Sequence, residues 1–567
     1  MMKKPVVLLL LIFSFRYVLS QHIASKDTSD FIAVKSKVYT NGAVSCAHPL
    51  AAEVGANILK KGGNAFDAAI ATQLALAVVY PQAGNIGGGG FLTARNKDGK
   101  LIALDYREKA PSEATRDMYL DSNGIADTHL SQDGHLSAGV PGSVAGFFAI
   151  YKYARLPFKE LIQPAIDLAR NGFAITAFEA ALLNRFKDDF ITYNGNNKVS
   201  FVKDSLWKAG DLLIQPELAK TLELIRDKGK KGFYEGETAK LIADEMQRGH
   251  GIISLKDLKN YEAKDRVPLQ FDYEGYKIIS FPPPSSGGLL LEQMMKMTAL
   301  FDLKKLGFHT AASIHVMAEA ERRAFADRAK FMGDPDFWKV PDSALINDNY
   351  LKQRMRSFDP NKATPSDSIG AGNPYESHQT THICIADKEG NLVSVTTTLN
   401  GLYGSRVVVK GAGFLLNDEM DDFSVKPGVP NMFGAVGGEA NAIAPNKRML
   451  SSMCPTLVLR DNRPFMIVGT PGGTTIPTSV FQSIVNVIDF GMGPAEAVNA
   501  PKFHHQWLPD EIIMEEGFDD KVINSLNAMN YKIDIVDGIG RNEMILFEKG
   551  KLHAVADIRG NDGVDGY

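Results

Sequence analysis

Two consecutive threonines at the start of an apolar stretch carry the most reactive chemistry in this sequence. Gln379, Thr380, Thr381 and His382 follow a segment rich in proline, serine and glycine, and a strand is predicted directly after them. A threonine hydroxyl is a weak nucleophile and needs an adjacent base. If the Gln379–Thr380 bond were cut, the new α-amine, with an ordinary pKa of about 8, could accept the hydroxyl proton. Taken alone, however, a Thr-Thr pair at a strand start more often reflects β propensity.

The sequence around these threonines predicts the strands and helices that position them. Strands are predicted over 382–386 and 392–399 with a turn at 387–391, a hairpin that brings Thr398 beside Thr380. The preceding segment, 359–379, is expected to be flexible and exposed because it is rich in proline, glycine and serine. Asn64 and Asp67 have the spacing of a capping box that opens an apolar, buried helix over 65–79. With further helices over 140–340 and 475–490, and strands near 456–469 and 543–556, the pattern predicts a layered fold of helices and antiparallel strands.

Composition narrows the class of protein. The 567 residues are 44% hydrophobic and carry a formal net charge of -4, which argues against a nucleic-acid partner or a polybasic membrane surface. Cys46, Cys384 and Cys454 are too few for a disulfide framework, and we interpret all three as buried small hydrophobes.

The N-terminus has the features of an export signal. Lys3 and Lys4 precede the apolar run 6–15, and a cut before Gln21 would follow small or apolar residues, so we predict a signal peptide over 1–20. A membrane anchor is the alternative, but the run is about half the ~20 residues that a spanning helix needs. The mature chain is therefore expected in the periplasm or the medium, without a membrane span.

Several long stretches of the sequence resemble the γ-glutamyltransferase family. The resemblance extends from about residue 35 to the C-terminus and rests on GNIGGGGF at 84–91, DYREKAP at 105–111, QTTHICIADKEGNLVSVTTTLN at 379–400, NDEMDDFSVKPGVPN at 417–431, PNKRMLSSMCPT at 445–456, GTPGG at 469–473 and NAPKFHHQWLPDE at 499–511. It implies an α+β N-terminal-nucleophile hydrolase fold, a four-layer αββα sandwich with antiparallel sheets. It also implies a precursor that cuts itself at Gln379–Thr380 into a large fragment, 21–379, and a small fragment, 380–567, which stay associated as a heterodimer and form the fold together.

The same resemblance implies a role for each site residue. Thr380 is the nucleophile, Thr398 helps to activate it, and Gly472 and Gly473 form the oxyanion hole. The resemblance also implies two sets of substrate-binding residues. The α-carboxylate of the substrate is bound by Arg107, Ser451 and Ser452. The α-ammonium group is bound by Asn400, Glu419 and Asp422. Pro427 to Phe433 matches a lid loop, with Phe433 where several members have tyrosine.

The reaction that this implies is acyl transfer from glutathione or another γ-glutamyl compound, through an ester on Thr380, to water or to an amino acid or dipeptide acceptor. The nearest alternative is a cephalosporin or glutaryl acylase on the same scaffold, which would not need ammonium ligands. The alternative from another class of protein is a non-enzymatic, exported binding protein whose chain is never cleaved. No cofactor is expected. Gly87 to Gly90 lacks the Lys-Ser/Thr of a phosphate loop, and the adjacent His504 and His505 would face opposite ways on a strand, so no metal site is expected either.

Overall fold

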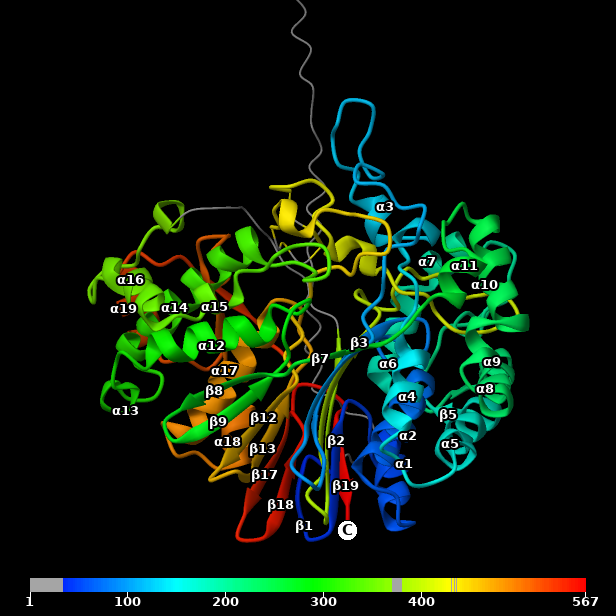
Figure 1. The fold of residues 1–567 in the computed structure, drawn as a ribbon, viewed down its shortest axis with the longest axis horizontal. Coiled ribbons are helices and arrows are strands. Elements are labelled where there is room, and N and C mark those ends of the chain that lie inside the picture. Colours follow the sequence, from blue (N-terminus) through cyan, green and yellow to red (C-terminus); the bar gives the residue numbers. More distant parts are fainter. Residues whose placement is uncertain (1–33, 370–379, 430, 433, 435) are drawn as a thin grey trace, which may run out of the picture.

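The computed structural model describes residues 34–369, 380–429, 431, 432, 434 and 436–567, and its centre is a pair of seven-stranded sheets (Figure 1). We call them the β13 sheet and the β10 sheet. The β13 sheet consists, in spatial order, of β1 (Ser36–Tyr39), β18 (Lys551–Val555), β17 (Glu543–Glu548), β13 (Arg463–Gly469), β12 (Thr456–Arg460), β9 (Tyr276–Ser280) and β8 (Leu269–Tyr273). The β10 sheet consists of β19 (Gly563–Gly566), β2 (Gly42–Cys46), β10 (Thr381–Asp387), β11 (Leu392–Thr398), β3 (Gly89–Arg95), β4 (Leu101–Asp105) and β7 (Lys264–Arg266). Every pairing within these two sheets is antiparallel.

Helices cover the outer face of each sheet, which completes four layers (Figure 1). On the β10 side lie α1 (Pro49–Lys60), α2 (Ala65–Val79), α4 (Ser143–Tyr151), α5 (Phe158–Asn171), α6 (Ala177–Arg185), α7 (Lys187–Asn194), α8 (Pro216–Lys228), α9 (Lys231–Tyr234), α10 (Gly236–Arg248) and α11 (Leu255–Lys259). On the β13 side lie α12 (Gly287–Thr298), α13 (Leu303–Leu306), α14 (Ala311–Phe331), α15 (Asp342–Leu345), α16 (Asp348–Arg354), α17 (Thr475–Ile488), α18 (Pro494–Asn499) and α19 (Asp520–Ala528). The predicted αββα sandwich is confirmed.

Smaller elements complete the chain. They are a three-stranded sheet of β14 (Phe503–His504), β15 (Ile512–Glu515) and β16 (Ile533–Val536), a two-stranded one of β5 (Phe173–Ala174) and β6 (Leu212–Leu213), and the short helix α3 (His129–Gln132). Within the described residues, no helix has both the length and the apolar composition that a bilayer crossing requires.

Local sequence signals explain where the first helices begin. The Asn64 side chain accepts from the backbone N–H of Asp67, and the Asp67 carboxylate accepts from the N–H of Asn64, so the predicted capping box opens α2. Every residue of α2 is buried, because α1, α4 and α5 pack around it and the β10 sheet lies on its remaining side. All three cysteines are buried and free, as expected.

Each sheet contains strands from both sides of the 379–380 bond, hydrogen-bonded to one another. β10 lies between β2 and β11, and β2 and β3 come from the chain before the bond. In the β13 sheet, β12 pairs with β9 on one side and β13 on the other. A cut at 379–380 would therefore leave two fragments that share both sheets and the core between them.

The segment before the bond is only partly as predicted. Most of residues 359–369 are exposed, but Ala363 and Ser366 are buried, so the expectation of an exposed segment is wrong there. The backbone N–H of Ala363 donates to the Met529 carbonyl (2.7 Å), and the N–H of Ser366 donates to the Asp510 carboxylate (2.8 Å). These contacts tie the segment to the C-terminal part of the chain. Residues 370–379, which include Gln379, and the predicted signal peptide at 1–20 lie outside the described residues.

A buried ionic cluster on α14 holds the same segment. The Glu319 carboxylate contacts the guanidinium groups of Arg322 and Arg323 and accepts from the backbone N–H (3.1 Å) and hydroxyl (2.6 Å) of Thr364. Burial acts to raise the pKa of Glu319, but the two arginines outweigh it and lower that pKa from its ordinary 4.5 to about 2. Glu319 is therefore ionised and compensates two buried cations.

Replacing Glu319 by glutamine should destabilise the protein because Arg322 and Arg323 would lose their buried counter-charge. We expect E319Q to cost about 3–5 kcal/mol, visible as a lower Tm in thermal unfolding at pH 7. Since the carboxylate has a lowered pKa in the folded state, its contribution is complete above about pH 4.5 and is lost as the pH falls toward 2. The Tm difference between wild type and E319Q should narrow over that range.

Glu321, two residues away on the same helix, provides a matched control. Burial raises its pKa well above the ordinary value and so disfavours its charged form, and it accepts from the backbone N–H of His505 (2.8 Å), which a glutamine oxygen can also do. E321Q should therefore lower the Tm less than E319Q. The reverse order would contradict the charge assignment.

Candidate active site

Thr380 lies one residue before β10, at the end of the ladder between β10 and β11. Thr381 faces Thr397 in this antiparallel register, so one further step sets Thr380 opposite Thr398. The predicted hairpin is confirmed, and its register is the one that the chemistry requires. Both side chains are buried, with 5% and 4% of their surface exposed.

Strand alternation points both threonines toward the β13 sheet. Ile383 and Ile385 pack into the core on the helix side, whereas Cys384 and Ala386 pack between the two sheets. Because successive side chains on a strand face opposite ways, Thr380 has the same orientation as Cys384. The position between the sheets is what brings Thr380 near the loop that follows β13.

His382 fills the space directly behind this position. Its ring accepts or donates at Thr396 Oγ1 (2.9 Å) and Ser394 Oγ (3.3 Å), and a Cβ on Gly469 of β13 would come within 2.2 Å of the ring. Burial lowers the pKa of His382 to about 3, so the ring is neutral. The neutral His382 ring therefore fills the space between β10 and Gly469 of β13.

Gly472 and Gly473 link β13 to α17, at the N-terminus of that helix. Their φ angles, +137° and +55°, are ones that side chains disfavour, and a Cβ on Gly472 would lie 2.5 Å from Thr475 Oγ1. The Gly472 carbonyl accepts from the backbone N–H (3.0 Å) and the hydroxyl (2.7 Å) of Thr475, which turns it toward the helix. Backbone N–H groups at such a helix start can stabilise a negative charge.

One cavity of about 330 Å³ unites these elements with the predicted binding residues. Its lining contains Thr380, Thr398 and Gly473, together with all six residues predicted to bind substrate: Arg107, Asn400, Glu419, Asp422, Ser451 and Ser452. Gly472 is not in the lining and lies behind Gly473. The cavity also includes residues that the sequence analysis did not identify: Arg328, Asn431, Met453, Thr474 and Ile476.

Arg107 is the central charge of the cavity. A surface pair would be the ordinary interpretation of Arg107-Glu108, yet the Arg107 side chain is 1% exposed. Its guanidinium forms ion pairs with the carboxylates of Glu419 and Asp422, and it reaches the carbonyls of Met449 and Leu450 (both 3.4 Å). Arg107 also lies 3.5 Å from the buried carboxylate of Glu108, so its guanidinium faces three carboxylates, of which Glu419 and Asp422 line the cavity.

Burial governs the ionisation of these two anions. Burial raises the pKa of Glu419 well above its ordinary value, and it raises the pKa of Asp422 as well, while Arg107 opposes both shifts. A second cation placed between them would favour the ionised forms. The site is therefore suited to a ligand that brings its own positive charge.

The residues after Thr398 fix the direction of its hydroxyl. Asn400 has a φ of +78°, and its backbone N–H donates to Thr398 Oγ1 (2.7 Å). Because Thr398 Oγ1 accepts in this hydrogen bond, its own hydrogen is not used and can be donated toward Thr380. The Asn400 amide itself donates to the Asp418 carbonyl (3.1 Å) at the edge of the cavity.

The glycine-rich stretch 84–91 packs against the same strand end. Asn85 Nδ2 donates to the Thr398 carbonyl (2.8 Å), and a Cβ on Gly88 would lie 2.1 Å from that carbonyl oxygen. The loop therefore packs tightly against the backbone of Thr398 and supports it.

The predicted lid contributes through its described residues. Pro427 is half-buried and does not line the cavity, whereas the Asn431 side-chain amide donates to Asp422 Oδ1 (3.1 Å) and the backbone N–H of Met432 donates to Asp421 Oδ2 (2.6 Å). Phe433 lies outside the described residues. The motif NDEMDDFSVKPGVPN already ended on Asn431, so a closer look at amide donors in it could have identified this residue.

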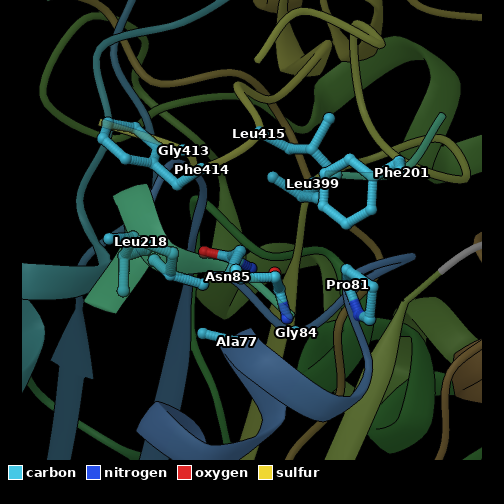
Figure 2. A pocket seen from close by; sticks show the side chains of 12 residues that line it. Ala77, Pro81, Gly84, Asn85, Phe201, Leu218, Leu399, Gly413, Phe414 and Leu415 are labelled. Atoms are coloured by element: carbon cyan, nitrogen blue, oxygen red, sulfur yellow. The ribbon is translucent and has the colours of Figure 1, made fainter. Parts of the chain in front are cut away.

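A second cavity, of about 240 Å³, is lined by Leu399, the residue that follows Thr398 (Figure 2). Pro81, Phe201, Leu399, Phe414 and Leu415 dominate its walls. It has no charged lining residue, so it does not match the chemistry of the first cavity.

The residues lining the first cavity constrain its chemistry further. They include neither histidine nor lysine, so no imidazole or ammonium of the described lining can serve Thr380 as a base. Across the described part of the chain, no group of three or more metal-ligating side chains occurs. His504 and His505 are both buried, and they bond to Thr478 (2.9 Å) and Asp510 (3.5 Å) respectively.

Comparison with known proteins places this geometry among related enzymes. The family model described as Gamma-glutamyltranspeptidase matches residues 51–567. A glutathione hydrolase proenzyme of Escherichia coli (strain K12) is 48% identical over 526 residues, 92% of this chain and 91% of the relative. Among solved structures, a γ-glutamyltranspeptidase of Helicobacter pylori is 48% identical, with a TM-score of 0.56 over 57% of this chain and 94% of its own. A cephalosporin acylase of Bacillus halodurans superposes with a TM-score of 0.82 over 94% of this chain and 97% of its own, but at 27% identity.

The support under Thr398 leads to a prediction. G88A should push the Thr398 carbonyl away, because the new Cβ would start 2.1 Å from it. A misplacement of about 1 Å near the reacting groups costs roughly 100-fold in rate, so we expect a loss of that order in turnover by the purified protein. G493A is the matched control, since no atom lies within 4 Å of a Cβ at Gly493. Equal activity of G88A and G493A would show that Thr398 does not depend on this packing.

Proposed function

The chain belongs to the gamma-glutamyltranspeptidase family, and from that premise we propose that it is a self-processed glutathione hydrolase and γ-glutamyltransferase whose nucleophile is Thr380. The observation that carries the proposal is the union, in one cavity, of Thr380 opposite Thr398 with a charge pattern that fits a zwitterion. The enzyme class follows from the family; the roles of single residues are our assignments.

The first reaction is the chain's own cleavage. Thr380 Oγ attacks the carbonyl carbon of residue 379, the C–N bond breaks, and the nitrogen becomes the free α-amine of Thr380. The resulting ester is hydrolysed by water, which leaves a carboxylate on residue 379 and a free hydroxyl on Thr380. The proenzyme name of the Escherichia coli relative supports such a precursor, and the interleaved sheets would hold the fragments 21–379 and 380–567 together.

The second reaction uses the new terminus. The α-amine takes the hydroxyl proton while Oγ attacks the γ-carbonyl carbon of the donor, and backbone N–H groups at Gly472–Gly473 stabilise the oxyanion. The intermediate collapses, the amine of the donor's leaving group departs with that proton, and a γ-glutamyl ester on Thr380 remains. Water then releases glutamate, or the amine of an amino acid or dipeptide acceptor forms a new amide. The absence of histidine and lysine from the described lining supports the α-amine as base.

In this proposal the donor is recognised by ion pairs between its two charged groups and the side chains of the cavity. The α-carboxylate binds Arg107, Ser451 and Ser452, and the α-ammonium binds Glu419, Asp422 and Asn400. Arg107 is paired with Glu419 and Asp422, so an incoming zwitterion replaces these internal ion pairs by pairs with its own two charges. The net charge of the buried site then stays unchanged, which a donor with a carboxylate alone could not achieve.

Two further proposals concern the whole chain. We assign 1–20 to an export signal, so that the mature protein acts in the periplasm or the medium; Lys3, Lys4 and the apolar run after them support this. The acylase alternative is supported by the shared fold and by an acylase proenzyme of Pseudomonas sp. (strain SE83) that is 36% identical, but the higher identity of 48% to the glutathione hydrolase of Escherichia coli favours the γ-glutamyl assignment.

Self-cleavage is tested by intact-mass analysis. We expect two masses for the wild-type protein, with a break at 379–380, and one unbroken chain for T380A, because alanine has no hydroxyl to attack the preceding carbonyl. T380S should still mature, since serine keeps the hydroxyl. An active wild-type protein with an intact backbone at this bond would refute the mechanism.

Donor selectivity tests the ammonium subsite. D422N removes one anion without changing shape, so it should lower kcat/KM for a γ-glutamyl anilide by about 100-fold, the cost of one lost charge-assisted contact of roughly 2–3 kcal/mol. The loss for a glutaryl anilide, which lacks the ammonium group, should be much smaller. A wild-type preference for the glutaryl donor would instead establish the acylase alternative.

A further inference from the structure

The turn 282–288, three prolines followed by Ser285, Ser286 and two glycines, joins β9 to α12 and lies against the carboxylate-binding serines. The Ser286 backbone N–H and its hydroxyl both donate to the Ser451 carbonyl, each at 2.7 Å. Ser285 and Ser451 also form a parallel β-bridge. Part of the chain before the 379–380 bond therefore holds the backbone of residues that lie after it.

Gly287 makes this close approach possible. A Cβ at that position would lie 2.8 Å from the Ser452 carbonyl oxygen and 2.5 Å from that of Met453. These distances are shorter than contacts that a side chain tolerates, so the helix start can reach the serine loop only with glycine there.

Arg328 on α14 joins the turn to the serine loop through its side chain. Its Nε donates to Ser286 Oγ (3.0 Å), and its Nη2 donates to Ser452 Oγ (3.2 Å). The residue is 7% exposed, and it lines the cavity that contains Thr380. Arg328 is thus a second buried guanidinium in the site, besides Arg107.

These contacts determine which way the serine hydroxyls point. Ser452 Oγ accepts from Arg328, and Ser451 Oγ accepts from the backbone N–H of Met453 (3.1 Å). A hydroxyl has one hydrogen to donate, and neither of these contacts uses it. Both hydroxyl hydrogens are therefore available to an anion in the cavity.

Resting on the proposed function, we propose that Arg328 is a positioning residue for the donor's α-carboxylate: its charge-assisted hydrogen bond to Ser452 Oγ holds the Ser452 hydroxyl as a hydrogen-bond donor to that carboxylate. Arg328 does not touch the reacting carbonyl in this scheme. Its effect should depend on the carboxylate of the donor and on Ser452, which a purely structural role would not.

The test compares R328Q with wild type on three anilide donors, each also assayed as a competitive inhibitor so that affinity is measured where turnover is slow. The γ-glutamyl anilide has both charges, the glutaryl anilide keeps only the carboxylate, and the 4-aminobutanoyl anilide keeps only the ammonium group. R328Q should raise KM or Ki by about 10- to 100-fold for the first two, the range for a lost hydrogen bond to a charged group, and leave the third within about 2-fold.

Further variants separate positioning from structure. S452A should lower affinity similarly, and the double variant R328Q/S452A should be little worse than S452A alone, because the two residues act through one hydroxyl. R328K keeps the charge and should recover part of the affinity. K330Q, an exposed neighbour on α14, is the control for substitution in this helix and should behave as wild type.

An equal loss on all three donors, or additive effects of R328Q and S452A, would overturn the role of Arg328 while leaving γ-glutamyl transfer by the wild type intact. Failure of both R328Q and R328K to mature, with K330Q maturing normally, would also overturn it by assigning Arg328 to folding. A wild-type protein without γ-glutamyl turnover would instead refute the proposed function itself, and this proposal with it.

Discussion

The pairing of β10 with β11 fixes the positions of Thr380 and Thr398, on which the chemistry proposed for the site depends. β10 is an inner strand, hydrogen-bonded to β2 on one side and β11 on the other, so it cannot shift its register without breaking two ladders. That register sets Thr380 opposite Thr398, and strand alternation turns both toward the β13 sheet. Gly473, in the loop that follows β13, lines the same cavity from the facing layer. A one-residue slip would turn Thr380 to the helix side.

The interleaved sheets connect self-cleavage to stability. Each large sheet contains strands from before and after residue 379, and the core between the sheets contains residues from both parts. The Glu319 cluster and Asp510 hold residues 364–366 on the approach to the cleavage point. A break in the backbone at 379–380 therefore removes one covalent bond but few of the contacts on which the fold depends.

The cavity gathers buried charges that most cores avoid. Arg107, Arg328, Glu419 and Asp422 line it together, and burial raises the pKa of both carboxylates. Buried ion pairs of this kind contribute little to stability compared with apolar packing. In the proposed function their value lies in selectivity: a ligand with one cation and one anion, spaced as in an α-amino acid, would replace these ion pairs without leaving an uncompensated charge.

Local patterns in the sequence predicted the β10–β11 hairpin, the α2 capping box and the buried cysteines. They also contain the motifs that carry the family resemblance. Each of these features depends on residues that are close together in the chain. The six binding residues were named through the family resemblance, whereas only tertiary structure showed that they share one cavity. Arg328 could not be found from sequence because it lies in the last turn of a long helix, 124 positions from the Ser452 that it contacts. The burial of Ala363 and Ser366 was likewise decided by distant partners: proline- and glycine-rich composition predicts a loop, but Met529 and Asp510 anchor its backbone.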